Sequence, residues 1–244
     1  MRRGYSFIGP LVLFATWYVC GLFGLLNEIY IPRLEEVGRA LFVQFMNEGA
    51  LIDLGYTVYL TAAGFFLAAV VGIPVGISLG FSKKVANSFS FLLEFFRSLP
   101  APAIFPLFLF LFGIGDDVKI MVAAFMLFWI IVKHTLTAVE RVSITRKKVG
   151  QIFQSNKITQ ALIVFWDALP GISSGLRIAF PLSLILIIVG EMFVGGASGI
   201  GQKIFESYSA YQTANLYAYI VLIGFLGYML DWIFVQAQKK IAYW

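Results

Sequence analysis

The sequence has 244 residues, of which 60% are hydrophobic and only 13% are charged. A soluble domain of this length carries about a quarter charged residues, so this composition excludes an ordinary soluble protein and indicates a multi-pass membrane protein. The net charge of +5 alone would also fit a nucleic-acid-binding protein, but in a membrane protein the informative quantity is where the basic residues lie.

Six apolar stretches are long enough, at about 20 residues each, to cross the hydrocarbon core of a bilayer. In chain order they are 8–26, 56–81, 89–113, 118–139, 172–194 and 214–235. The first follows Arg2 and Arg3 as in a signal peptide. It is too long for the apolar core of one, and no small-residue cleavage site follows, so we expect it to be retained. The predicted fold is an all-α integral membrane domain over residues 1–244, with its core at 50–238.

The basic residues gather on one side of these six spans. With the N-terminus in the cytoplasm, 14 of the 18 Lys and Arg residues fall at cytoplasmic positions, and only Arg33, Arg39, Lys119 and Lys203 fall outside. This bias predicts that both termini are cytoplasmic. It also accounts for the positive charge without a nucleic-acid partner.

The third stretch carries Arg97 in its first half and contains Pro100 and Pro106. Proline removes a backbone donor and kinks a helix, which membrane helices tolerate where neighbours satisfy the freed carbonyls. Two interpretations stay open, a kinked structural helix and a helix that lines or gates a path. Arg97 and Lys133 are expected near the inner face, a position that does not argue for an anion site.

The fifth stretch carries Arg177 and Glu191, which are about 21 Å apart along a helix. This distance is less than the hydrocarbon thickness of about 30 Å, so at least one charge lies within the membrane or the helix is broken. Because Arg177 can extend to the inner surface, Glu191 is the expected buried charge. Intramembrane acids are candidates for function, and the alternative is a carboxylate at the outer rim.

Residues 140–170 form a cytoplasmic segment that is too polar at its start to span and too apolar later for a free loop. Ile152, Phe153 and Ile158 fall near helical spacing, and Ser155-Asn156 is a plausible turn or cap between short amphipathic helices. Such helices need a cover for their apolar face, either the lipid headgroup layer or a soluble partner.

The sequence lacks the common nucleotide-binding, metal-binding and catalytic motifs that we considered. It contains no G-x-x-x-x-G-K-[ST] phosphate loop and no H-E-x-x-H, C-x-x-C or G-x-S-x-G motif. One Cys and one His exclude a disulfide framework and a His/Cys metal cluster, so we expect no metal site. The residues alone leave three possible functions open: a transport subunit, a channel or a membrane assembly factor.

Two long runs resemble the permease subunits of type I ABC importers, in particular the nitrate/sulfonate/taurine branch. One is LPGISSGLRIAFPLSLILIIVGEMFVGGASGIG, from residue 169, and the other is RSLPAPAIFPLFLFLFGIGDDVKI, from residue 97. The resemblance covers residues 30–235 in order. It implies six transmembrane helices, with short cytoplasmic coupling helices between the fourth and fifth.

The resemblance implies a permease subunit of an ATP-driven importer in the prokaryotic inner membrane, surrounded by lipid. Its path would carry a small solute, such as a sulfonate, nitrate or a thiamine-precursor-like compound, delivered by an extracytoplasmic binding protein. The chain would not be an enzyme and would hold no cofactor, because ATP and Mg²⁺ would bind a partner ATPase dimer. A second permease chain would complete the path. The alternatives are an ATPase-independent channel or carrier and a non-transporting assembly subunit.

The resemblance also assigns roles to residues. The ATPase-coupling residues would be Val149, Gly150, Ile152, Phe153, Gln154, Ser155 and Asn156. The hinge, where Pro170 and Gly171 would turn the chain into the fifth span, would be Pro170, Gly171, Gly175 and Arg177. The translocation path or gate would include Arg97, Pro100, Pro106, Glu191, Gly199 and Gly201.

One part of the family pattern is altered. The family's Glu-Ala-Ala coupling signature falls on Lys147-Lys148-Val149, and its glycine falls on Phe153. The helical pattern is kept, whereas the acid and the turn glycine are not. The departure implies an unusual ATPase partner, or a heterodimer with a second permease chain that carries the ordinary motif.

Overall fold

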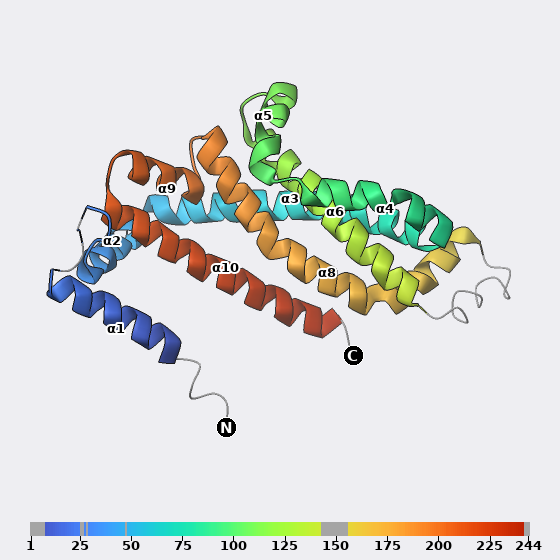
Figure 1. Cartoon of the computed structure of the whole chain (residues 1–244), viewed down its shortest axis with the longest axis horizontal. Helices are drawn as coiled ribbons and strands as arrows, with labels where there is room; N and C mark the ends of the chain where they lie inside the picture. The colour runs from blue at the N-terminus through green and yellow to red at the C-terminus, as the bar shows by residue number, and fades with distance from the viewer. Residues whose placement is uncertain (1–7, 25–26, 28, 47, 143–155, 242–244) are drawn as a thin grey trace.

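The computed structural model describes residues 8–24, 27, 29–46, 48–142 and 156–241, and these residues are helical apart from short connections. The helices are α1 (Ile8–Leu22), α2 (Leu34–Met46), α3 (Glu48–Gly80), α4 (Lys83–Ser98), α5 (Ala101–Phe112), α6 (Asp116–Arg141), α8 (Lys157–Val194), α9 (Ile200–Ser209) and α10 (Thr213–Ile241). In Figure 1, α3, α6 and α8 form the centre of the molecule, α10 runs along one flank and α5 projects from the body.

Four helices are long and apolar enough to cross a membrane. They cover Gly49–Gly80, Asp116–Arg141, Ile158–Val194 and Thr213–Lys239 and correspond to the second, fourth, fifth and sixth predicted spans. The α4–α5 pair would make a fifth span if the two helices count as one, and α1 is apolar but shorter. Among the described residues the span count is therefore four or five by length and composition, and six stays a prediction.

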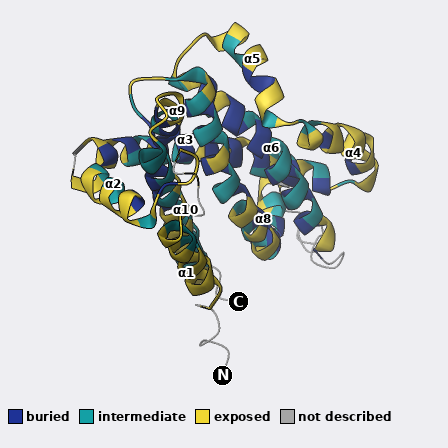
Figure 2. Cartoon of the chain, turned by 60° about the vertical axis from the view of Figure 1, so that its left-hand side comes forward, coloured by how far each residue is buried: buried dark blue, intermediate teal, exposed yellow. Residues whose placement is uncertain are grey.

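The packing of α3 on α6 depends on glycines with a four-residue spacing. A Cβ atom at Gly76 would lie 2.6 Å from Cβ of Thr135, and one at Gly80 would lie 2.5 Å from Cγ1 of Val139. Residues four apart lie on one helix face, and small residues there let two membrane helices approach closely. Figure 2 shows the result, with buried residues concentrated along α6 and exposed ones on the outer faces of α2 and α4.

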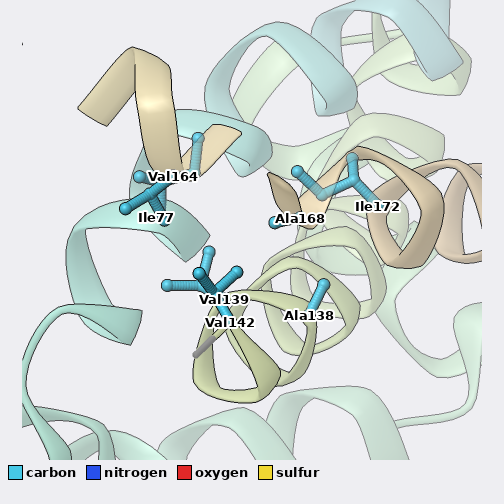
Figure 3. Close-up of a cluster of buried hydrophobic side chains, with 7 residues drawn as sticks. All are labelled: Ile77, Ala138, Val139, Val142, Val164, Ala168 and Ile172. Atoms are coloured by element: carbon cyan, nitrogen blue, oxygen red, sulfur yellow. The ribbon is translucent and has the colours of Figure 1, made fainter. Parts of the chain in front are cut away.

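A buried apolar cluster joins α3, α6 and α8 near the end of the bundle where α6 finishes. It contains Ile77, Ala138, Val139, Val142, Val164, Ala168 and Ile172, and Figure 3 shows side chains of the three helices meeting there. The close approach of α8 to α6 again needs glycine, because a Cβ atom at Gly171 would lie 2.6 Å from Cβ of Ala138.

The third predicted span, 89–113, is wrong as a single helix. Helix α4 ends at Ser98 and α5 begins at Ala101, with Leu99 and Pro100 extended between them, and the two helices meet at 93°. Pro100 has no N–H to donate and disfavours helical backbone at the residue before it. Pro106, in contrast, lies inside α5.

The predicted turn at Pro170 and Gly171 is also wrong. Helix α8 continues from Lys157 to Val194, with Pro170 and Pro181 inside it. Its ribbon is bent in Figure 1 but not interrupted. An internal proline removes one hydrogen bond and bends a helix, and here the helix continues past Pro170 with Gly171 and Gly175 packed closely against α6.

Candidate functional site

Glu191, near the end of α8, lies at the centre of a buried polar junction. Its carboxylate is fully buried. It accepts hydrogen bonds from the Thr57 hydroxyl at 2.8 Å and from the backbone N–H of Gly201 at 2.8 Å. Since a buried carboxylate is stable only where it is hydrogen-bonded, these two partners fix α8 against α3 and α9.

The same junction supplies hydrogen-bond acceptors to the backbone N–H groups at the start of α9. The first N–H groups of a helix have no partner within it and carry partial positive charge. Here the Gly199 N–H donates to Asp53 at 2.8 Å, and the Ile200 N–H donates to the Thr57 hydroxyl oxygen at 3.1 Å. Asp53 and Glu191 therefore cap α9 from two other helices. We call Asp53, Thr57, Glu191, Gly199 and Gly201 the α9 junction.

Two glycines make the α9 junction possible. Gly199 has a φ of +129°, and a Cβ atom there would lie 2.6 Å from Cδ of Glu191. A Cβ atom at Gly201 would lie 2.4 Å from the carbonyl oxygen of Ile188. The structure thus brings together Glu191, Gly199 and Gly201, three of the residues named as a path or gate, and the role of these residues in transport stays a prediction.

Sequence reasoning missed Lys119 as a site residue, because it was counted only as a basic residue at the outer end of the fourth predicted span. Lys119 is fully buried, and its ammonium lies 3.1 Å from Asp116 in the first turn of α6. The Tyr56 hydroxyl donates to the same carboxylate. A lysine three residues after an acid at the start of an apolar span is the signal that could have found this pair.

The exposed side of α9 carries an ion pair between Lys203 and Glu206 at 3.0 Å. The hydrogen bond from Lys203 lowers the pKa of the Glu206 carboxyl, and the hydrogen bond to Glu206 raises the pKa of Lys203. Both groups therefore stay charged near neutral pH, but this pair is not part of the α9 junction.

A second polar site lies at the other end of α6. Arg97, Lys133 and Arg141 line a cavity of about 530 Å³ between α4, α6 and α8. Glu94 binds two of these bases, at 2.9 Å from Nζ of Lys133 and at 3.2 Å from Nη2 of Arg97. Arg97, named from the sequence as a path residue, is not part of the α9 junction. Its ion-pair network reaches α6 at Lys133, whereas residues beside Glu191 pack against Lys119, and these two α6 positions are about 21 Å apart along the helix.

The remaining predicted residues do not converge on one site. Arg177 faces α10, where it pairs with Asp231 at 3.7 Å, and Gly175 lies on the face of α8 that packs against His134. Asn156 caps α8, and its side chain accepts a hydrogen bond from the Thr159 N–H at 2.8 Å. The other predicted coupling residues, Val149, Gly150, Ile152, Phe153, Gln154 and Ser155, lie outside the described residues.

Neither polar site is arranged as a metal centre. Among the residues that the structure describes, no group of three or more His, Cys, Asp or Glu side chains could hold a metal ion. The α9 junction connects α3, α8 and α9 by hydrogen bonds, and the cavity is lined by basic side chains.

Known proteins are similar in sequence to this chain over nearly its whole length. It is 27% identical to the putative aliphatic sulfonates transport permease protein SsuC of Bacillus subtilis, over 96% of this chain and 85% of the relative. It is 30% identical to the nitrate import permease protein NrtB of Synechocystis, over 90% and 82%. It is 25% identical to the taurine transport system permease protein TauC of Escherichia coli, over 97% and 88%.

A solved structure shares the fold. The chain matches one from the MetNI methionine ABC transporter in inward-facing conformations, with a TM-score of 0.70 and 18% identity, covering 81% of this chain and 98% of that one. Residues 72–243 match the family model described as the binding-protein-dependent transport system inner membrane component. This stretch includes α4 to α10 and most of the core. The chain therefore belongs to this family of ABC importer permeases, in its nitrate/sulfonate/taurine-type branch.

Proposed function

We propose that this chain forms the membrane path of an ATP-driven importer together with a second permease chain, identical or related. The observation that carries the proposal is the family match over residues 72–243. A separate ATPase dimer would bind ATP and Mg²⁺, and an extracytoplasmic binding protein would deliver the solute. A channel or carrier that works without ATP is disfavoured, because the relatives are import permeases.

The proposal includes six spans with both termini in the cytoplasm. It is supported by the distribution of the basic residues, which is typical of cytoplasmic ends. In this orientation the end of α6 and the start of α8 face the cytoplasm, and the α9 junction faces outward. The segment between α6 and α8 then reaches the ATPase through Val149, Gly150, Ile152, Phe153, Gln154, Ser155 and Asn156.

We propose a small anion as the solute. The names of the relatives specify sulfonates, nitrate, bicarbonate and taurine, which are small oxyanions or carry a sulfonate group. This chemistry favours an anion over a thiamine-precursor-like compound. Hinge movement at Pro170, Gly171, Gly175 and Arg177, now placed within the bent α8, would transmit the ATPase cycle to the path.

The proposal is tested by reconstituting the chain with its ATPase and binding protein in liposomes. We expect ATP-dependent uptake, and we expect Gln154→Lys to reduce both uptake and solute-stimulated hydrolysis because it places a charge in the ATPase contact. The same substitution at Gln236, on α10, is the matched control and should leave both rates near the parent values.

Two results would contradict the proposal. Uptake by the isolated chain without ATP would identify a channel or carrier. No uptake in any combination of subunits would identify an assembly protein. Normal hydrolysis and uptake in Gln154→Lys would disprove the docking segment alone.

A further inference from the structure

The cavity at the end of α6 is lined by charges of predominantly one sign. Its lining includes Arg97, Lys133 and Arg141, and Asp167 is the one acid among the described lining residues. The three bases come from α4 and α6 and the acid comes from α8, so folding brings these charges together. A volume of about 530 Å³ is within the range of small-molecule sites.

The cavity has an apolar, buried part. Ala138, Val142 and Ala168 line it, and all three belong to the buried cluster shown in Figure 3. An apolar lining beside a few polar groups excludes water from part of a ligand and strengthens the attraction of the charges.

Two of the three bases already hold an anionic group. Glu94 lies within hydrogen-bonding distance of Lys133 and Arg97, and all three side chains are partly exposed. Arg141 has no ion-pair partner among the described residues. Arg97 and Lys133 therefore already pair with a carboxylate of the chain itself, and the guanidinium of Arg141 remains. A guanidinium forms bidentate contacts to oxyanions.

We infer that this cavity binds a small oxyanion through Arg97, Lys133 and Arg141, in competition with Glu94. The sequence position of Arg97 and Lys133 did not argue for an anion site, and the inference rests instead on the cavity that they share with Arg141. The inference also rests on the proposed function, because it places a binding site for the transported solute on the cytoplasmic side of the path. Sulfonate, nitrate and bicarbonate share the chemistry, and so does the phosphate of a lipid headgroup, so both sources are tested.

The test measures binding to the purified full chain in nanodiscs of zwitterionic lipid. Methanesulfonate and nitrate are titrated calorimetrically at constant ionic strength, with chloride as the reference anion. We expect saturable binding of the oxyanions that exceeds chloride binding. Arg97→Gln and Arg141→Gln should each weaken it about tenfold or more, because each removes a charge-assisted contact.

Glu94→Gln is the decisive variant, because it acts in the opposite direction. Removing the competing carboxylate frees Lys133 and Arg97, so the oxyanion should bind several-fold more tightly. This variant keeps the inference testable if an arginine variant fails to fold. Lys84→Gln, an exposed base on the same helix as Arg97 and outside the cavity, should change nothing.

The outcomes separate this inference from the proposed function. Oxyanion binding that equals chloride binding, or that is unaffected in both arginine variants and in Glu94→Gln, overturns the inference even if ATP-driven uptake occurs. Binding as expected without uptake in any reconstitution overturns the proposed function and leaves the site. Displacement of methanesulfonate by phosphatidylglycerol in the nanodisc assigns the oxyanion to a lipid headgroup, and the absence of displacement assigns it to a solute.

Discussion

At the scale of the residue, Glu191 shows how a carboxylate can be buried among apolar helices. A charged or polar group in such surroundings is costly unless partners surround it. Glu191 has them, because Thr57 and Gly201 donate to its two oxygens. Its position is therefore a structural requirement of the α9 junction, whatever part it also takes in transport.

Glu191→Ala should lower the free energy of unfolding by about 1–3 kcal/mol, because it leaves the buried donors of Thr57 and Gly201 without an acceptor. Glu206→Ala is the matched control, since Glu206 lies on the exposed side of α9 and should lose well under 1 kcal/mol. Denaturant titration of the detergent-solubilised protein measures both. Equal losses would show that the α9 junction does not stabilise the fold.

The sequence could predict only one half of the α9 junction. Glu191 was found because its spacing from Arg177 placed a charge at membrane depth. Asp53 and Thr57 were not found, because they lie on α3, more than 130 residues earlier. No local pattern reports a partner at that separation.

At the scale of the element, the sequence contains one dipeptide with two different outcomes. Leu99-Pro100 separates α4 from α5, whereas Leu169-Pro170 lies inside α8. The local steric effect of proline is the same at both places. The difference is in packing, because the residues after Pro170 are held against α6 by Gly171 and Gly175. Helix existence was therefore predictable from apolar length, and helix boundaries at prolines were not.

Gly76→Ala should destabilise the protein by about 1–3 kcal/mol, because the added methyl group overpacks the contact of α3 with α6. Its Cβ would meet the Thr135 side chain at 2.6 Å and the Val132 carbonyl oxygen at 2.9 Å. Gly55→Ala, on the same helix, meets nothing within 4 Å. That control should be neutral or stabilising by up to about 1 kcal/mol.

Unfolding in mixed detergent micelles gives both free energies. If the two alanine variants have the same stability, the close contact between α3 and α6 is not what holds these helices together.

At the scale of the whole molecule, the proposed orientation places the two polar sites on opposite sides of the membrane. Cysteine accessibility tests this arrangement in a Cys20→Ser background. Ile114→Cys and Tyr211→Cys, at exposed connections, should react with an impermeant maleimide in intact spheroplasts. Lys84→Cys and Lys239→Cys should react only after permeabilisation, because they lie on the positive-inside face.

The reverse labelling pattern would invert the orientation. Labelling of Ile114→Cys and Lys84→Cys from the same side would show that α4 and α5 together do not cross the membrane. Either result is read directly from the labelled fraction before and after permeabilisation.

The unbroken course of α8 has a mechanical consequence. Its 38 residues follow a bent but continuous path of about 57 Å along the helix, with Asp167 in its first third and Glu191 in its last turn. A rod that tips about its middle swings its ends in opposite directions. One tilt of α8 would therefore move its contacts with the cavity and with the α9 junction in opposite directions. Opening of one site would then accompany closing of the other.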